Sequence, residues 1–175
     1  EMFLNLNLSK SKNIYEIKNL KFFNDKNLLK FDNIKFGQNF KITDFSSIEA
    51  KYYNKDEFIN DLLIKKKNNN IKVNLNKFDI SKNIEKILKS TSKSNFLDIF
   101  HNLNSSVNID IKLARLDNKH DLKNVNGKAL IKKSKVDKAN LLAKFDDGNK
   151  FIYTKDELNG KKVTTIYSDI AKPFV

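Results

Sequence analysis

The sequence contains no cysteine and few residues that interrupt regular structure. The lack of cysteine excludes disulfide bonds, thiolate metal sites and cysteine nucleophiles. Four glycines and one proline among 175 residues argue against a linker-rich or fibrous protein. No stretch approaches the ~18 apolar residues that a membrane-spanning helix needs, and no signal peptide is recognisable. Hydrophobic residues make up 39% of the chain and include 14 phenylalanines, so the chain can bury a substantial core.

Motifs that carry catalytic chemistry are also missing. There is no glycine-rich phosphate loop, no G-x-S-x-G and no H-E-x-x-H. His101 and His120 are isolated, so a surface or loop position is favoured over metal ligation. The adjacent acids at 146–147 and 156–157 lie in or beside predicted turns, where aspartate accepts backbone hydrogen bonds. We therefore predict a protein that is not an enzyme and uses neither a cofactor nor a metal.

The net positive charge is large, but the basic residues are not clustered in one part of the chain. The net charge is +13, which invites a nucleic-acid interpretation. However, Arg115 is the only arginine, and arginine is the residue best suited to bidentate contacts with phosphate and guanine. The lysines are spread along the whole chain, as expected for solvated faces. We predict no nucleic-acid partner, and a weak attraction to anionic lipid head groups stays open.

Alternation of apolar and polar residues dominates the chain. Residues 2–8 (MFLNLNL), 71–75 (IKVNL) and 106–113 (SVNIDIKL) each place apolar side chains at every second position. This period is typical of β-strands with one buried and one solvated face. The asparagines at 68–70 separate a predicted strand at 58–64 from the strand at 71–75.

The C-terminal part predicts an antiparallel meander. The sequences DDGN at 146–149 and NG at 159–160 are strong hairpin signals. Around them, we predict strands at 125–133, 135–145, 150–155 and 161–167.

One segment in the middle departs from the strand pattern. Residues 81–89 are predicted to form a helix, because isoleucines and a leucine recur at helical spacing and Asp79 or Ser81 can cap its first turn. Residues 96–103 could form a second short helix. The predicted fold is mainly β, a curved antiparallel meander sheet with one or two short α-helices. We divide it into an N-terminal half at 1–89 and a C-terminal meander at 90–175.

A fixed order of weak motifs near the C-terminus gives a family resemblance. Segments VNGKALIKK, VDKANLLAKFDDG, KFIYTKD and NGKKVTTIYSDIAKPFV follow one another. This order resembles the AsmA-like proteins of Gram-negative bacteria, most closely the YhdP-type branch. The likeness covers roughly residues 40–175 and includes NKFDISKNIEKIL and SVNIDIKLARL upstream. The motif positions in this chain are Leu141, Ala143, Phe145, Gly148, Asn159, Gly160, Ser168, Asp169 and Ala171.

The resemblance implies a role in lipid transport. Members resemble bridge-like lipid transfer proteins, in which a curved sheet offers an apolar groove to phospholipid acyl chains on the way to the outer membrane. It implies a periplasmic location as part of an inner-membrane-anchored protein, with phospholipid and other envelope proteins as partners. The chain would be a fragment of such a longer protein. The groove-lining candidates are Val107, Ile109, Ile111, Leu113, Ala139, Leu141, Ala143 and Phe145.

Three other interpretations remain open at this stage. The same alternation forms a closed sandwich or a helix-covered sheet in which the apolar face is ordinary core. The segment would then be a structural or interaction module whose sheet edges pair with neighbours. The next interpretation is a lysine-rich nucleic-acid-binding domain. An enzyme is the least favoured of the three.

Overall fold

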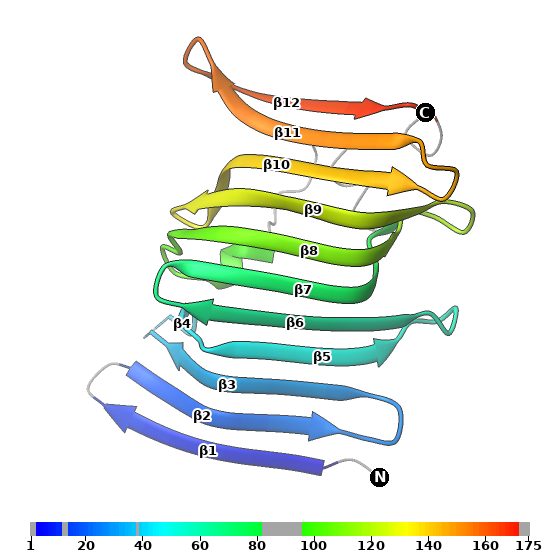
Figure 1. Ribbon diagram of the computed structural model, residues 1–175. Helices are drawn as coiled ribbons and strands as arrows, with labels where there is room; N and C mark the ends of the chain where they lie inside the picture. The colour runs from blue at the N-terminus through cyan, green and yellow to red at the C-terminus, as the bar shows by residue number, and fades with distance from the viewer. Residues whose placement is uncertain (1–2, 12–13, 38, 82–95, 172–175) are drawn as a thin grey trace.

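The computed structural model describes residues 3–11, 14–37, 39–81 and 96–171. These residues form one curved, open sheet of twelve strands, which runs without a break from β1 at one edge to β12 at the other (Figure 1). The mainly β, curved fold predicted from the sequence is confirmed. The strands are β1 (Phe3–Ser11), β2 (Ile14–Phe23), β3 (Leu28–Phe36), β4 (Ile42–Asp44), β5 (Ser47–Tyr53), β6 (Ile59–Lys67), β7 (Asn70–Asp79), β8 (Ser105–Arg115), β9 (Asp121–Lys132), β10 (Lys135–Phe145), β11 (Lys150–Leu158) and β12 (Lys161–Ser168).

Local turn chemistry sets most of the hairpins. Asn159 and Gly160 have φ of 51° and 75° and connect β11 to β12, because a two-residue type I′ turn requires positive φ at both positions. Gly148 has φ of 85° in the turn between β10 and β11. In that turn, the Asp147 carboxylate accepts hydrogen bonds from the backbone and side-chain amides of Asn149 at 3.0 and 2.7 Å. The turn role predicted for Asp147 is therefore confirmed.

The sheet contains one pairing that the meander prediction missed. β7 pairs with β8 in parallel, whereas the other pairings between its strands are antiparallel. A parallel pair needs a crossover of a dozen or more residues, and residues 80–104 supply it. The strands on either side of the predicted boundary at 89/90 thus belong to one sheet. The predicted helix at 81–89 lies almost entirely outside the described residues, and the second predicted helix is a 3₁₀-helix, η1 (Phe96–Ile99).

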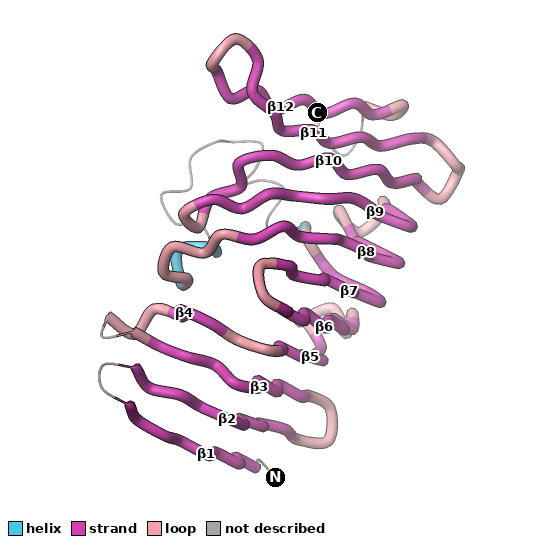
Figure 2. The backbone as a smooth tube through the Cα atoms, turned by 60° about the vertical axis from the view of Figure 1, so that its left-hand side comes forward, coloured by secondary structure: helices cyan, strands magenta, loops and turns pink. Residues whose placement is uncertain are grey.

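The end of the crossover docks on one face of the sheet, which we call the inner face (Figure 2). Phe100 forms a parallel bridge with Ile42, and the His101 N–H donates to the Ile42 carbonyl at 2.8 Å. Further on, the Leu103 N–H donates to Ser134 Oγ at 2.9 Å, and Ser134 Oγ donates to the Phe100 carbonyl at 3.1 Å. The segment therefore joins β4 to the β9–β10 turn.

This docking explains a hairpin turn that lacks glycine. Lys133 and Ser134 connect β9 to β10 with φ of 49° and 58°, a conformation that L-residues adopt only at a cost. The hydrogen bonds of Ser134 with the crossover, including its N–H to the Leu103 carbonyl at 2.9 Å, offset that cost.

We expect Ser134→Ala to lower the free energy of unfolding by about 1–3 kcal/mol, because the buried Leu103 N–H loses its acceptor. Urea unfolding of the purified chain measures this effect. The matched control is Ser106→Ala, which removes an exposed hydrogen bond to Asn70 and should change stability by less than about 0.5 kcal/mol. Equal losses in the two variants would contradict the anchoring role of Ser134.

Two clusters of buried side chains lie on the inner face. The first joins the docked crossover to the middle of the sheet and contains Ile34, Phe45, Ile71, Phe100, Leu103, Val107 and Ile131. The second lies at the opposite ends of β8–β11 and contains Ala114, Leu116, Leu122, Val125, Ala143, Phe145 and Phe151. Other inner-face residues pack against both clusters: Phe31, Ile48, Ile64, Val73 and Ile109 contact the first, and Ile111, Leu141 and Tyr153 contact the second.

Candidate functional site

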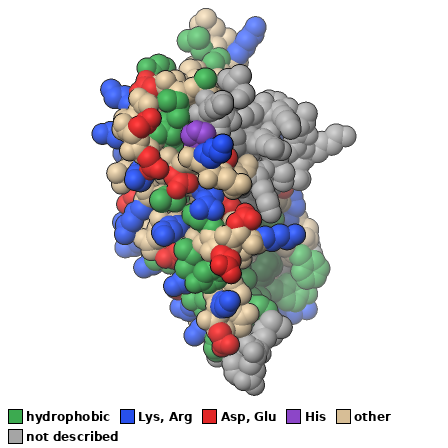
Figure 3. Space-filling model, turned by 90° about the vertical axis from the view of Figure 1, so that its right-hand side faces the viewer, with side chains coloured by type: hydrophobic (Ala, Val, Ile, Leu, Met, Phe, Trp, Pro, Cys, Tyr) green, Lys and Arg blue, Asp and Glu red, His purple; other side chains and the backbone are tan. Residues whose placement is uncertain are grey.

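The two faces of the sheet have different chemistry. Along β10, Ala139, Ala143 and Phe145 are buried, whereas Asn140, Leu142 and Lys144 between them are exposed. In Figure 3, Lys, Arg, Asp and Glu side chains are spread along the left side of the molecule. Hydrophobic side chains gather at the lower right. The inner face is therefore the apolar one.

Strand pairing aligns the inner-face residues into a row that crosses the sheet. Directly paired residues of neighbouring strands project to the same face, so the register identifies the members of a row. One row passes through every strand from β2 to β12 except β4, a span of roughly 40 Å at about 4.8 Å per strand. We call it the apolar row: Leu20, Phe31, Ile48, Ile64, Val73, Ile109, Gly127, Leu141, Tyr153 and Ile166.

A second row runs beside the first over part of the sheet. It connects β2 to β9 and consists of Phe22, Leu29, Ala50, Leu62, Leu75, Ile111 and Val125. No polar residue interrupts either row, apart from the hydroxyl of Tyr153. Together, the two rows form a continuous apolar strip perpendicular to the strands.

The C-terminal part of this strip borders an apolar cavity of about 340 Å³. Its lining comes from β8 to β12, from Leu116 in the loop between β8 and β9, and from Ile80 at the start of the crossover. The lining side chains are Ile, Val, Leu, Ala and Phe, together with Tyr153. Burial raises the pKa of the Tyr153 hydroxyl, although its hydrogen bond with Thr164 acts in the opposite direction. A cavity with so few polar groups can hold a hydrocarbon but offers little to bind water.

The structure divides the eight groove candidates among neighbouring places on the inner face. Ile109, Ile111, Ala139 and Leu141 line the cavity. The other members of the set, apart from Leu113, belong to the two packed clusters: Val107 in the first, and Ala143 and Phe145 in the second.

Leu113 is not among the cavity-lining residues, and it is paired with Lys77 and Lys123. The pairing of β8 with β9 skips Lys112 and Asn124, and Asn124 has φ of 52°. As a result, Ile111 and Ala114 both line the cavity although they are three positions apart. Simple alternation from Ile109 predicted Leu113 at the place that Ala114 takes.

Small residues in the strip and beside it account for the hollow. The paired positions Ala129 and Ala139 lie beside Gly127, which is paired with both Ile109 and Leu141. A Cβ atom on Gly127 would lie 2.1 Å from the Asn140 carbonyl oxygen and 2.7 Å from Leu141 Cδ2. The sequence analysis missed Gly127, because its role depends on the register, although a lone glycine within a strand pattern signals a close backbone approach.

Charged residues from β9 to β12 gather near the β9–β10 and β11–β12 turns. The Asp137 carboxylate forms ion pairs with Lys132 Nζ at 2.8 Å and with Lys162 Nζ at 2.6 Å. The two ammonium groups, that of Lys132 first, lower the pKa of Asp137 to about 2. Lys162 also contacts Glu157 at 3.0 Å. The ion pairs tie the last strands together beside the cavity.

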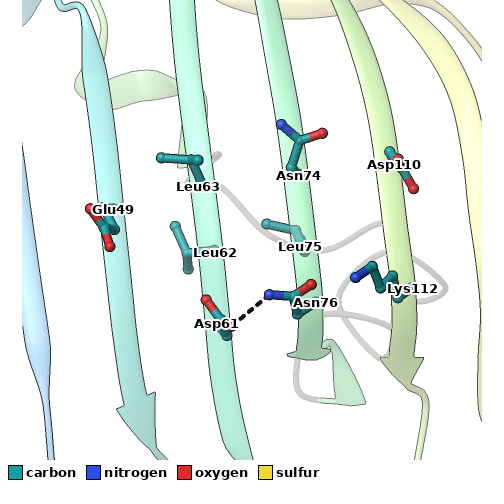
Figure 4. Close-up of a pocket in the computed structure, with 9 residues that line it drawn as sticks. All are labelled: Glu49, Asp61, Leu62, Leu63, Asn74, Leu75, Asn76, Asp110 and Lys112. Carbon is teal, nitrogen blue, oxygen red and sulfur yellow. Dashed lines mark hydrogen bonds between the residues drawn. The ribbon is translucent and has the colours of Figure 1, made fainter.

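A second hollow lies on the opposite face and has a different character (Figure 4). It measures about 320 Å³ and is lined by side chains that include Glu49, Asp61, Asn76, Asp110 and Lys112. Asn76 Nδ2 donates to the Asp61 carboxylate at 2.7 Å. Within the described ranges, no group of three His, Cys, Asp or Glu residues is arranged to hold a metal ion. Leu62, Leu63 and Leu75 also line this hollow, so its lining is mixed, with charged groups that the lining of the apolar cavity lacks.

The histidines and helices add no further site. The His120 ring contacts the Asp117 carboxylate at 2.8 Å in the loop between β8 and β9, and His101 is exposed in the docked crossover. Among the residues that the structure describes, no helix is both long and apolar enough to span a bilayer. Comparison with protein families, with curated proteins and with solved structures gives no match.

Proposed function

We propose that the chain handles phospholipid by offering its apolar strip to acyl chains. The observation that carries this proposal is the uninterrupted apolar row from β2 to β12, which ends in a cavity of about 340 Å³. Acyl chains form no directional bonds, so interchangeable aliphatic side chains are sufficient to bind them. Each Å² of hydrocarbon covered by the strip gains about 25 cal/mol relative to water.

The setting that we propose follows the resemblance to AsmA-like proteins of the YhdP type. The chain would be one segment of an inner-membrane-anchored periplasmic protein that moves phospholipid between the two membranes and supports outer-membrane maintenance. The sheet itself would be the working part, and the proposed function involves no catalysis. The excess of lysine, at a net charge of +13, suits a path for molecules with anionic head groups.

A structural module is the second candidate, and the two packed clusters favour it. Phe100 and Leu103 of the docked crossover cover the inner face at one end of the strands. Phe145 and Phe151, whose ring centroids are 6.4 Å apart, fill the face at the other end. In this alternative, the strip would serve only to stabilise the sheet.

Extraction of lipid from the purified chain tests the proposed function. We expect organic extraction after purification from bacterial cells to release phospholipid in an amount comparable to that of the protein. The matched control is Ala139→Phe, which fills part of the cavity and should lower the recovered lipid several-fold while the chain stays folded. Lipid-free wild-type protein that also takes up none from phosphatidylglycerol vesicles would contradict the proposal.

A further inference from the structure

The apolar cavity has a polar border on its β11–β12 side. Ala139 on the cavity floor is paired with Lys155 on β11, and Lys155 is paired with Thr164 on β12. Because paired residues share a face, Lys155 and Thr164 lie on the inner face beside the cavity. Tyr153, a lining residue, is two positions from Lys155 on the same face of β11 and lies diagonally opposite Thr164. The ammonium group of Lys155 and the hydroxyl groups of Tyr153 and Thr164 therefore adjoin the apolar cavity.

Lys155 differs from three nearby lysines in its lack of a carboxylate partner among the described residues. The nearby Lys132 and Lys162 form ion pairs with Asp137 at 2.8 and 2.6 Å, and Lys138 forms one with Asp156 at 2.7 Å. Lys155 takes part in none of the ion pairs between residues that the structure describes. The residue is partly buried, as expected for a lysine that packs its aliphatic stem against the inner face and keeps its ammonium group at the surface.

The volume of the cavity limits how much hydrocarbon it can hold. A cavity of about 150 Å³ binds one benzene molecule, so the 340 Å³ available here is enough for roughly twelve carbon atoms. That volume fits one acyl chain and excludes two chains side by side. The cavity thus has the dimensions and the polar border of a site for a single-chain amphiphile.

We propose that the cavity binds one acyl chain of an anionic amphiphile and that the Lys155 ammonium contacts its phosphate or carboxylate head. This inference rests on the proposed function and specifies its ligand: one chain at a time, with selection for negative charge. The hydroxyl groups of Tyr153 and Thr164 donate hydrogen bonds to the same head group. The chain enters with its methyl end toward Gly127 and Leu141.

Calorimetric titration of the full chain with three twelve-carbon probes tests this inference. The probes are dodecyl phosphate, dodecanoate and the neutral 1-monolauroylglycerol, each below its micelle concentration. We expect one molecule bound per chain, and both anions to bind at least tenfold more tightly than the neutral probe. Lys155→Gln should remove this preference without weakening binding of the neutral probe. Lys144→Gln, on the opposite face, should keep it.

Each result separates the inference from the function on which it rests. Equal affinity of the wild-type chain for the three probes, or an anion preference that survives in Lys155→Gln, would overturn the assignment of Lys155 but leave the acyl-chain site intact. Preference for only one of the two anions would show which head group the site accepts. Failure of all three probes to bind would overturn the proposed function itself.

Discussion

Replacing Gly127 with valine is expected to break the pairing of β9 with β10 and to cost about 3 kcal/mol or more of stability. The cause is steric, since a Cβ atom at this position would lie 2.1 Å from the Asn140 carbonyl oxygen. That oxygen belongs to the backbone of the neighbouring strand and cannot move away without disturbing the sheet. Gly127 is also paired with the cavity-lining residues Ile109 and Leu141, so the same variant distorts the cavity floor.

Thermal unfolding followed by circular dichroism measures the effect of Gly127→Val. In a chain of this length, a loss of about 3 kcal/mol lowers Tm by roughly 6–12 °C. Gly37→Ala is the control, because a Cβ atom there meets only Thr43 Cγ2 at 3.4 Å and Asn39 Oδ1 at 3.6 Å. That variant should leave Tm within a few degrees. A Gly127→Val protein as stable as the wild type would contradict the close approach of β9 and β10.

The second large effect is expected from a charge placed on the apolar strip. Leu141→Asp should reduce bound phospholipid at least tenfold, because a carboxylate beside the acyl chain loses its hydration. The chain should nevertheless stay folded, since Leu141 borders a cavity of about 340 Å³ that water can enter around the new carboxylate. Lipid loading and Tm of the purified variant give the two readouts.

Leu142→Asp is the matched control for that experiment. Leu142 is the next residue of β10 and has the same side chain, but it faces the opposite side and is 53% exposed. Neither lipid loading nor Tm should change in this variant. If Leu141→Asp unfolds the chain whereas Leu142→Asp does not, the inner face is ordinary core and the structural module is the better account.

Much of the local structure was predictable from the sequence. β10 was expected at 135–145 and spans Lys135–Phe145. The hairpin turn at Asn159 and Gly160 was found from its two residues alone, because positive φ at both positions selects strongly for them. Ile109 and Leu141, two of the groove candidates implied by the family resemblance, both line the cavity.

The features that escaped prediction depend on contacts between distant residues. The parallel pairing of β7 with β8 has no local sequence signal, because the crossover that joins them fixes it. The turn at Lys133 and Ser134 lacks glycine and is held by hydrogen bonds from the docked crossover. The irregular register at Asn124 moved Ala114 into the place expected for Leu113. In each case, a tertiary contact overrides a local preference.

Photo-crosslinking in living bacteria tests most directly whether the apolar strip is a path for lipid. A photoreactive amino acid would be placed at Leu141 in one variant and at Leu142 in another, since these neighbours face opposite sides of β10. We predict that irradiation links phospholipid to the first variant and not to the second. Crosslinks from position 141 that reach only side chains of the protein itself would show that the strip is packed core and would contradict the account.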